Sequence, residues 1–170
     1  MKITLVAHDI RSTHNVGAFF RTCDGLGIQE ILFSGYTPYP TFEGDSRIPH
    51  FADKITRQIH KTALGAESTV NFKHYHTIEE VLATLHNDHA TLIALEQHEA
   101  SNNPKDISKR LKASDTESIA LIVGNEVHGV SPSILVQMDY IMEIPMQGKK
   151  ESLNVSVATA IALYELTRAI

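Results

Sequence analysis

Three polar segments of this chain contain residue types that could hold a ligand and act on it. In chain order they are Asp9 to Gly17, Gly124 to Gly129, and Pro145 to Asn154. Glycine lets a backbone approach a ligand closely, and Glu126 supplies a carboxylate. Ser152 and Asn154 suit the start of a helix, whose free N–H groups favour polar or anionic ligand groups. These segments therefore predict a ligand site built from loops.

Each segment alone also has an ordinary structural explanation. Asn15-x-Gly17-x-x-x-Arg21 places Asn15 and Arg21 almost two helical turns apart and close to one face. The same pattern fits an Asn cap, a small residue at a helix contact and a solvated arginine. Gly124-Asn-Glu126-x-x-Gly129 is neither a dinucleotide fingerprint nor a Walker loop, and it also fits a glycine-rich turn with a surface glutamate.

The elements that must position these segments alternate along the chain. The pattern predicts strands at 2–7, 30–34, 70–75, 91–95, 118–123 and 140–144, and helices at 15–27, 52–64 and 77–86, a short one after Ser131-Pro132, and one from 152–154 to the chain end. Continuous apolar strands alternating with helices indicate an α/β fold, a mostly parallel sheet with helices on both faces. Ligands on such sheets lie at the carboxyl ends of the strands, where the three segments fall.

The last helix is apolar on nearly every side, with Val155, Val157, Ile161, Leu163 and Leu166 spread around it. Such a helix in a small domain is expected to be buried on two faces. One of those faces could be shared with a second subunit, so the sequence predicts a homodimer.

The totals favour a single domain over residues 1–170, large enough to bury a core. The chain starts directly in a strand without a signal peptide, and no apolar run approaches the roughly 20 residues that cross a bilayer. Cys23 is the only cysteine, which excludes an internal disulfide and favours the cytoplasm. Ten histidines lack convincing ligand spacing, so no metal site is expected.

The formal net charge of −5 hides an uneven distribution. Between Ser46 and Ala63 four cations accompany a single acid, and Phe51 could stack on a base. This stretch, on and after the long loop 35–49, predicts a substrate clamp, with a solvated helix as the equally weighted alternative. Its cations are Arg47, Lys54, Arg57 and Lys61, with His60 beside them.

Taken together, the three segments resemble the three motifs of the SpoU/TrmH family of SPOUT-class RNA methyltransferases. The matching residues are Asn15-x-Gly17-x-x-x-Arg21, Ile122-Val-Gly-Asn-Glu126-x-x-Gly129, and Ile144-Pro-Met-x-Gly148-x-x-x-Ser152-Leu-Asn154. The resemblance covers essentially the whole chain. It implies a SPOUT-like fold with a C-terminal trefoil knot, S-adenosylmethionine as cofactor, and an RNA substrate methylated on a ribose 2′-hydroxyl, with tRNA favoured over rRNA.

The resemblance also implies a division of the site residues. Those that would hold the cofactor are Leu95, Gly124, Ile144, Ser152 and Leu153, and those of the reaction site are Arg21, Asn15, Glu126, Ser152 and Asn154. Arg21 would meet the cofactor of the neighbouring subunit. A guanidinium stays protonated, so Arg21 would bind the adjacent phosphate and stabilise the developing alkoxide, while Glu126 would orient Arg21 or Asn15.

Two other classes of function stay open at this point. One is a catalytically silent RNA-binding protein with the same fold, which three complete motifs argue against. The other is a nucleotide-binding oxidoreductase, which would need the glycine fingerprint and ribose-binding acid that this chain lacks.

Overall fold

The computed structural model describes residues 1–114 and 116–168 as alternating strands and helices. In order these are β1 (Lys2–His8), α1 (Thr13–Gly25), β2 (Glu30–Ser34), α2 (Pro49–Ala63), the 3-10 turn η1 (Ala66–Ser68), β3 (Asn71–Tyr75), α3 (Ile78–Asn87), β4 (Thr91–Leu95), α4 (Pro104–Ala113), β5 (Ser118–Val123), α5 (Pro132–Leu135), β6 (Tyr140–Met142) and α6 (Val155–Thr167). No helix within these described ranges is long and apolar enough to span a membrane.

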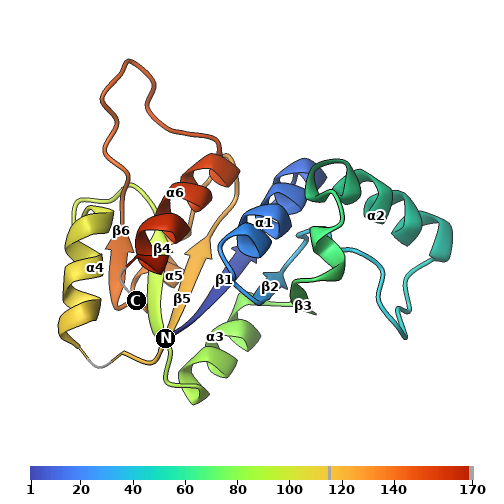
Figure 1. The fold of residues 1–170 in the computed structure, drawn as a ribbon, viewed down its shortest axis with the longest axis horizontal. Helices are drawn as coiled ribbons and strands as arrows, with labels where there is room; N and C mark the ends of the chain where they lie inside the picture. The colour runs from blue at the N-terminus through green and yellow to red at the C-terminus, as the bar shows by residue number, and fades with distance from the viewer. Residues whose placement is uncertain (115, 169–170) are drawn as a thin grey trace.

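The six strands form one sheet in the order β3-β2-β1-β5-β4-β6, and every neighbouring pair is parallel. Buried apolar side chains such as Phe19 of α1, Ile59 of α2, Ile107 of α4 and Leu163 of α6 belong to one core cluster, and those of α3 and α5 belong to another. Figure 1 shows the sheet with α1 and α6 next to each other on one face. The predicted parallel α/β sheet with helices on both faces is confirmed, whereas the trefoil knot stays a prediction.

Alternating residues of the central strands explain why two cores are needed. In β1, Leu5 belongs to the first cluster and Val6 to the second, and β5 divides in the same way at Leu121 and Ile122. All four side chains are inaccessible to solvent. Because successive strand residues point to opposite faces, such strands are stable only between two layers of helices.

Helix α1 begins two residues earlier than expected because Ser12, not Asn15, caps it. The Ser12 side chain accepts a hydrogen bond from the Asn15 backbone N–H at 3.3 Å. Gly17 is the small residue at a helix contact, because a Cβ there would lie 2.3 Å from the carbonyl oxygen of Ile59 on α2. The Ser12 cap leaves the Asn15 side chain available for other contacts.

Helix α2 and strand β6 also differ from the sequence expectation in extent, and one α-helix was missed. Helix α2 starts at Pro49 instead of Ala52, and β6 ends at Met142 instead of Ile144. Helix α4 was not expected, although Asn103 caps it by accepting from the Asp106 N–H and Pro104 fills its first turn. The expected end of the last helix, at 169–170, lies outside the described residues.

Within one chain, α6 is buried on a single face, and burial of its other face by a second subunit stays a prediction. Thr159, Ala162, Leu163 and Leu166 are buried, on the face toward the first core cluster. On the other side Val157 is 48% exposed, Ile161 38% and Tyr164 48%. The helix therefore has one buried face and one apolar face open to solvent.

Candidate functional site

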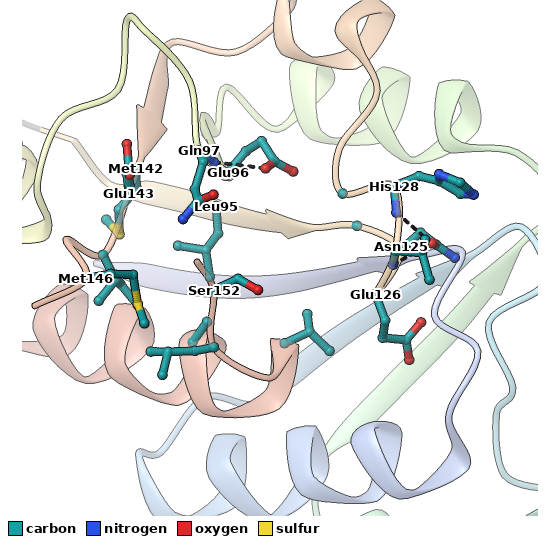
Figure 2. A pocket seen from close by; sticks show the side chains of 17 residues that line it. Leu95, Glu96, Gln97, Asn125, Glu126, His128, Met142, Glu143, Met146 and Ser152 are labelled. Carbon is teal, nitrogen blue, oxygen red and sulfur yellow. Dashed lines mark hydrogen bonds between the residues drawn. The ribbon is translucent and has the colours of Figure 1, made fainter. Parts of the chain in front are cut away.

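A cavity of about 290 Å³ lies at the carboxyl ends of β4, β5 and β6, and we call it the loop pocket. Its lining comes from three segments far apart in sequence, namely 95–97, 124–129 and 142–158. The lining residues are Leu95, Glu96, Gln97, Gly124, Asn125, Glu126, Val127, His128, Gly129, Met142, Glu143, Ile144, Met146, Ser152, Leu153, Val155 and Ala158. Figure 2 shows Leu95 and Ser152, from two of these segments, on facing sides of the pocket.

Glycine is required where the 124–129 segment folds back on itself. The backbones of Asn125 and Gly129 form a two-way bridge, with N···O distances of 3.1 and 2.8 Å. A Cβ on Gly124 would lie 2.2 Å from the carbonyl oxygen of Gly129, so even alanine would force the turn open. Gly129 itself has a φ of +64°, which side chains other than glycine rarely adopt. These glycines therefore keep the turn tight against the pocket.

Glu96 fastens the first segment to the second. Its Oε2 accepts from the Val130 N–H at 2.7 Å, and its Oε1 accepts from the Gln97 N–H at 2.9 Å. The Gln97 side chain in turn donates to the carbonyl oxygen of Glu151 at 2.6 Å. These bonds link all three pocket segments, yet neither Glu96 nor Gln97 belonged to a recognisable sequence pattern.

Asn125 is a third residue that the sequence did not single out. Its Oδ1 accepts from the N–H groups of Val127 and His128 at 2.8 and 3.0 Å, which fixes the turn (Figure 2). Its Nδ2 donates to the Tyr36 hydroxyl at 2.6 Å and to the carbonyl oxygen of Asp9 at 3.0 Å. Asn125 thus connects the loop pocket with the segments that follow β1 and β2.

Glu126 holds the start of α1 with both carboxylate oxygens. Oε1 accepts from the Ser12 N–H at 3.0 Å and from Asn15 Nδ2 at 2.9 Å, and Oε2 accepts from the Arg11 N–H at 2.9 Å. Partial burial alone would raise the pKa of Glu126, but these bonds outweigh it and leave the pKa below its ordinary value. An ionised carboxylate with three donors is suited to positioning groups and is a weak base.

Asn15 and Arg21 lie apart in the structure, on different sides of α1. Asn15 is 8% exposed and bonded to Glu126, whereas Arg21 is exposed. The expectation that they share a helix face is wrong, because six residues turn a helix by about 600° and leave the two side chains about 120° apart. Arg21 also lies about 9 Å further along the helix axis. The Glu126 carboxylate orients Asn15, and Arg21 forms no hydrogen bond to it among the described residues.

The five expected cofactor residues all line the loop pocket, namely Leu95, Gly124, Ile144, Ser152 and Leu153. Asn154 serves the pocket indirectly as the cap of α6. Its Oδ1 accepts from the Ser156 N–H at 2.9 Å and from the Ser156 hydroxyl at 2.6 Å. This cap fixes the point at which the third pocket segment becomes helix.

The expected clamp cation Arg47 is already committed within the protein. It pairs with Asp45 at 2.6 Å, donates to the carbonyl oxygens of Tyr39 and Pro40, and lies 3.7 Å from the centre of the Tyr39 ring. Its side chain is only 18% exposed. Arg47 therefore braces the loop before α2, and this part of the clamp prediction is wrong.

The loop pocket fits S-adenosylmethionine in size and chemistry. Its volume is close to the lower end of the roughly 300–1,000 Å³ typical of small-molecule sites. Leu95, Ile144 and Leu153 offer apolar surface for an adenine ring, while Glu96 and Ser152 offer polar groups for the ribose and amino acid parts. In the described ranges no group of three or more His, Cys, Asp or Glu side chains is placed to bind a metal ion.

Comparison with known proteins gives consistent matches over nearly the whole chain. Residues 2–164 match the model of the SpoU rRNA Methylase family. The chain is 30% identical over 166 residues to tRNA (guanosine(18)-2′-O)-methyltransferase of Aquifex aeolicus, covering 98% of this chain and 69% of that protein. Against the protein of that name in Escherichia coli K12, identity is 28% and coverage is 98% of this chain and 63% of the relative.

A solved structure described as A. aeolicus TrmH/SpoU tRNA modifying enzyme superimposes with a TM-score of 0.76 at 27% identity, covering 99% of this chain and 75% of that one. This chain thus spans about two thirds to three quarters of these relatives.

Proposed function

Because this chain belongs to the SpoU methylase family, we propose that it is an S-adenosylmethionine-dependent RNA methyltransferase that acts on a ribose 2′-hydroxyl, with tRNA as the substrate. The observation that carries the proposal is the convergence of all five expected cofactor residues on one pocket beside the Glu126 carboxylate. The free, buried Cys23, whose thiol pKa burial raises to about 12, supports a reducing, cytoplasmic setting as part of this proposal.

The chain's residues divide the work of the reaction. When bound, S-adenosylmethionine would supply a methyl group activated by its sulfonium. Transfer to the ribose O2′ would replace the methyl C–S bond with a C–O bond, and the hydroxyl proton would pass to water. Gly124 and Leu153 hold the pocket shape, and Glu126 fixes Asn15 beside it. The permanently charged Arg21 binds the neighbouring phosphate and stabilises negative charge developing on O2′.

Two features of the described chain support a homodimer as part of this proposal. Arg21 is exposed and about 9 Å along α1 from the Asn15–Glu126 contact, so it serves a second subunit's pocket more readily than its own. Val157, Ile161 and Tyr164 form an apolar stripe at i, i+4 and i+7 on the open face of α6. A second copy of this chain is the proposed occupant of that stripe.

The dimer is tested by Ile161→Asp, which should convert a dimer into monomers in light scattering at micromolar concentration. Mixing Arg21→Ala subunits with Gly124→Val subunits should restore part of the activity, because one mixed site then has an intact pocket and an intact Arg21. A wild-type chain that scatters as an 18.8 kDa monomer would contradict the shared site.

The experiment for the function itself combines calorimetry with methyl transfer to bulk tRNA. We expect saturable binding of S-adenosylmethionine, no binding of NAD, and transfer of labelled methyl groups to RNA. Cofactor binding without transfer would favour the catalytically silent RNA-binding protein, and NAD binding alone would favour the oxidoreductase.

A further inference from the structure

A second cavity, which we call the aromatic hollow, lies where β1 and β2 end and α2 begins. It measures about 490 Å³ and is lined by Arg11, Thr13, Tyr36, Pro38, Phe51, Lys54, Ile55 and Gln58. In Figure 1 the long segment between β2 and α2 runs out beside α2, at the side of the sheet opposite α4. None of these residues belongs to the loop pocket, so the hollow is a distinct surface.

Tyr36 presents its ring to solvent although it is held at both ends. Its backbone N–H donates to Asp9 Oδ1 at 3.2 Å, and its hydroxyl accepts from Asn125 Nδ2 at 2.6 Å. The residue is nevertheless 59% exposed. An exposed aromatic ring held in one orientation loses little further freedom when a flat ligand stacks on it.

Helix α2 supplies the opposite wall with one of its faces. Phe51, Lys54, Ile55 and Gln58 lie at i, i+3, i+4 and i+7, a spacing that places them on the same side of the helix. Phe51 is 53% exposed, although a ring of this size is more often covered. The hollow thus combines two open aromatic rings with polar and apolar neighbours.

Two cations of the hollow are free to meet an anion. Arg11 and Lys54 are exposed, and neither forms an ion pair with a carboxylate within residues 1–114 or 116–168. The Arg11 backbone N–H, in contrast, donates to Glu126 at 2.9 Å. This bond fixes the backbone of Arg11, and therefore the base of the Arg11 side chain, beside the loop pocket. Free cations next to open aromatic rings match a phosphate and a base of the same nucleotide.

We infer that the aromatic hollow binds one nucleotide of the RNA substrate, with its base on the rings of Tyr36 and Phe51 and its phosphate at Arg11 and Lys54. The inference rests on the proposed function and deepens it. Asn125 bonds to Tyr36 and lines the loop pocket, so a nucleotide in the hollow lies next to the methyl donor. Stacking accepts any base, so the hollow positions a nucleotide and leaves sequence choice to other contacts.

The test measures the affinity of bulk tRNA, purified from cells that lack this gene, by filter binding with S-adenosylhomocysteine present. Phe51→Ala should weaken tRNA binding roughly 10- to 100-fold, because stacking on an aromatic side chain contributes strongly to the binding of each base. Phe51→Trp should keep the affinity within about threefold, because indole preserves the stacking surface. Calorimetric affinity for S-adenosylmethionine should not change in either variant.

Phe42→Ala is the matched control, because Phe42 is 51% exposed and lies outside the hollow. Lys54→Ala tests the phosphate contact, and should lower the slope of log affinity against log salt by about 0.7–0.9. Lys61→Ala, on the same helix but outside the hollow, should leave that slope unchanged. The lysine pair also decides the question if Phe51→Ala is poorly folded.

Three results would overturn the inference. They are an unchanged tRNA affinity in both Phe51→Ala and Lys54→Ala, an equal loss in the Phe42→Ala and Lys61→Ala controls, and a shift of Phe51→Ala from dimer to monomer, which would make the hollow an interface between copies. Binding is read without turnover, so a wild-type chain that binds tRNA through the hollow but transfers no methyl group would contradict the proposed function alone.

Discussion

The loop pocket and the aromatic hollow lie at the same edge of the sheet, but their linings are held very differently. The pocket is closed by glycine turns and by carboxylate and amide side chains that bond from one loop to the next, as Glu96 does to Val130. The hollow exposes side chains such as Phe51 and Lys54, whose outer ends are free. An enclosed pocket suits one small cofactor, whereas a hollow with exposed side chains suits contact with a large polymer.

The largest effect should come from distorting the 124–129 turn that shapes the loop pocket. Gly124→Ala places a Cβ 2.2 Å from the Gly129 carbonyl oxygen and so must open the 124–129 turn. We expect calorimetric affinity for S-adenosylmethionine to fall by about 100-fold or more, and stability to fall by about 1–3 kcal/mol. Binding of tRNA through the hollow should change far less.

Gly148→Ala is the control for that change, since no heavy atom lies within 4 Å of a Cβ built there. It should bind the cofactor as the wild type does. Equal losses in Gly124→Ala and Gly148→Ala would show that the tight turn is not what shapes the pocket.

The second effect concerns Glu126, which lines the loop pocket and bonds to the backbone of Arg11 in the aromatic hollow. Glu126→Ala removes the acceptor for the Arg11 and Ser12 N–H groups and for Asn15. Turnover should fall roughly 10- to 100-fold through misplacement of Asn15, and stability should fall by about 1–3 kcal/mol. Glu126→Gln keeps one oxygen acceptor and should lose less of both, as measured by steady-state kinetics and thermal unfolding. Identical losses in the two variants would exclude a positioning role for that oxygen.

A smaller effect is expected when Arg47, which is bonded within the protein, is compared with the exposed Arg57. Arg47→Ala removes the contacts to Asp45 and Tyr39 and should lower stability by about 1–3 kcal/mol without changing the salt slope of tRNA binding. Arg57→Ala, an exposed change on α2, should stay within about 0.5 kcal/mol of the wild type. A lower salt slope for Arg47→Ala would show that Arg47 contacts RNA phosphate after all.

The smallest effect is in the pH dependence of stability. The folded state lowers the pKa of Glu126 below 4.5, so its contribution is present above that value and is lost as pH falls through the lower folded pKa. Denaturant unfolding of the wild type and Glu126→Gln should therefore give a stability difference at pH 7 that shrinks below about pH 4.5. A difference that stays constant down to pH 3 would exclude this linkage.

The sequence predicted those parts of the fold that depend on local patterns. Strands β2, β4 and β5 lie at the predicted residues, because continuous apolar runs bounded by polar residues mark buried parallel strands. Helix α4 was missed because its sequence is rich in lysine and only Pro104, Ser108, Ile107 and Leu111 are buried. The cap at Asn103 and the proline after it were the available signal.

For the candidate site, the sequence predicted which segments form it but not the side-chain bonds that join them. Parallel strands bring their carboxyl ends to one edge, so the three motifs had to approach one another. The bonds of Glu96 and Asn125 join loops distant in sequence and follow no spacing rule. A count of charges near Arg47 likewise could not show that Arg47 is already paired with Asp45 and stacked on the Tyr39 ring.

The most direct test of the central claim is to locate the transferred methyl group. Bulk tRNA from cells lacking this gene would be incubated with the protein and methyl-deuterated S-adenosylmethionine, digested to nucleosides and analysed by mass spectrometry. The account predicts label on the ribose of one nucleoside, absent when Gly124→Ala replaces the wild type. Label on a base, or no label with a protein that binds the cofactor, would contradict it.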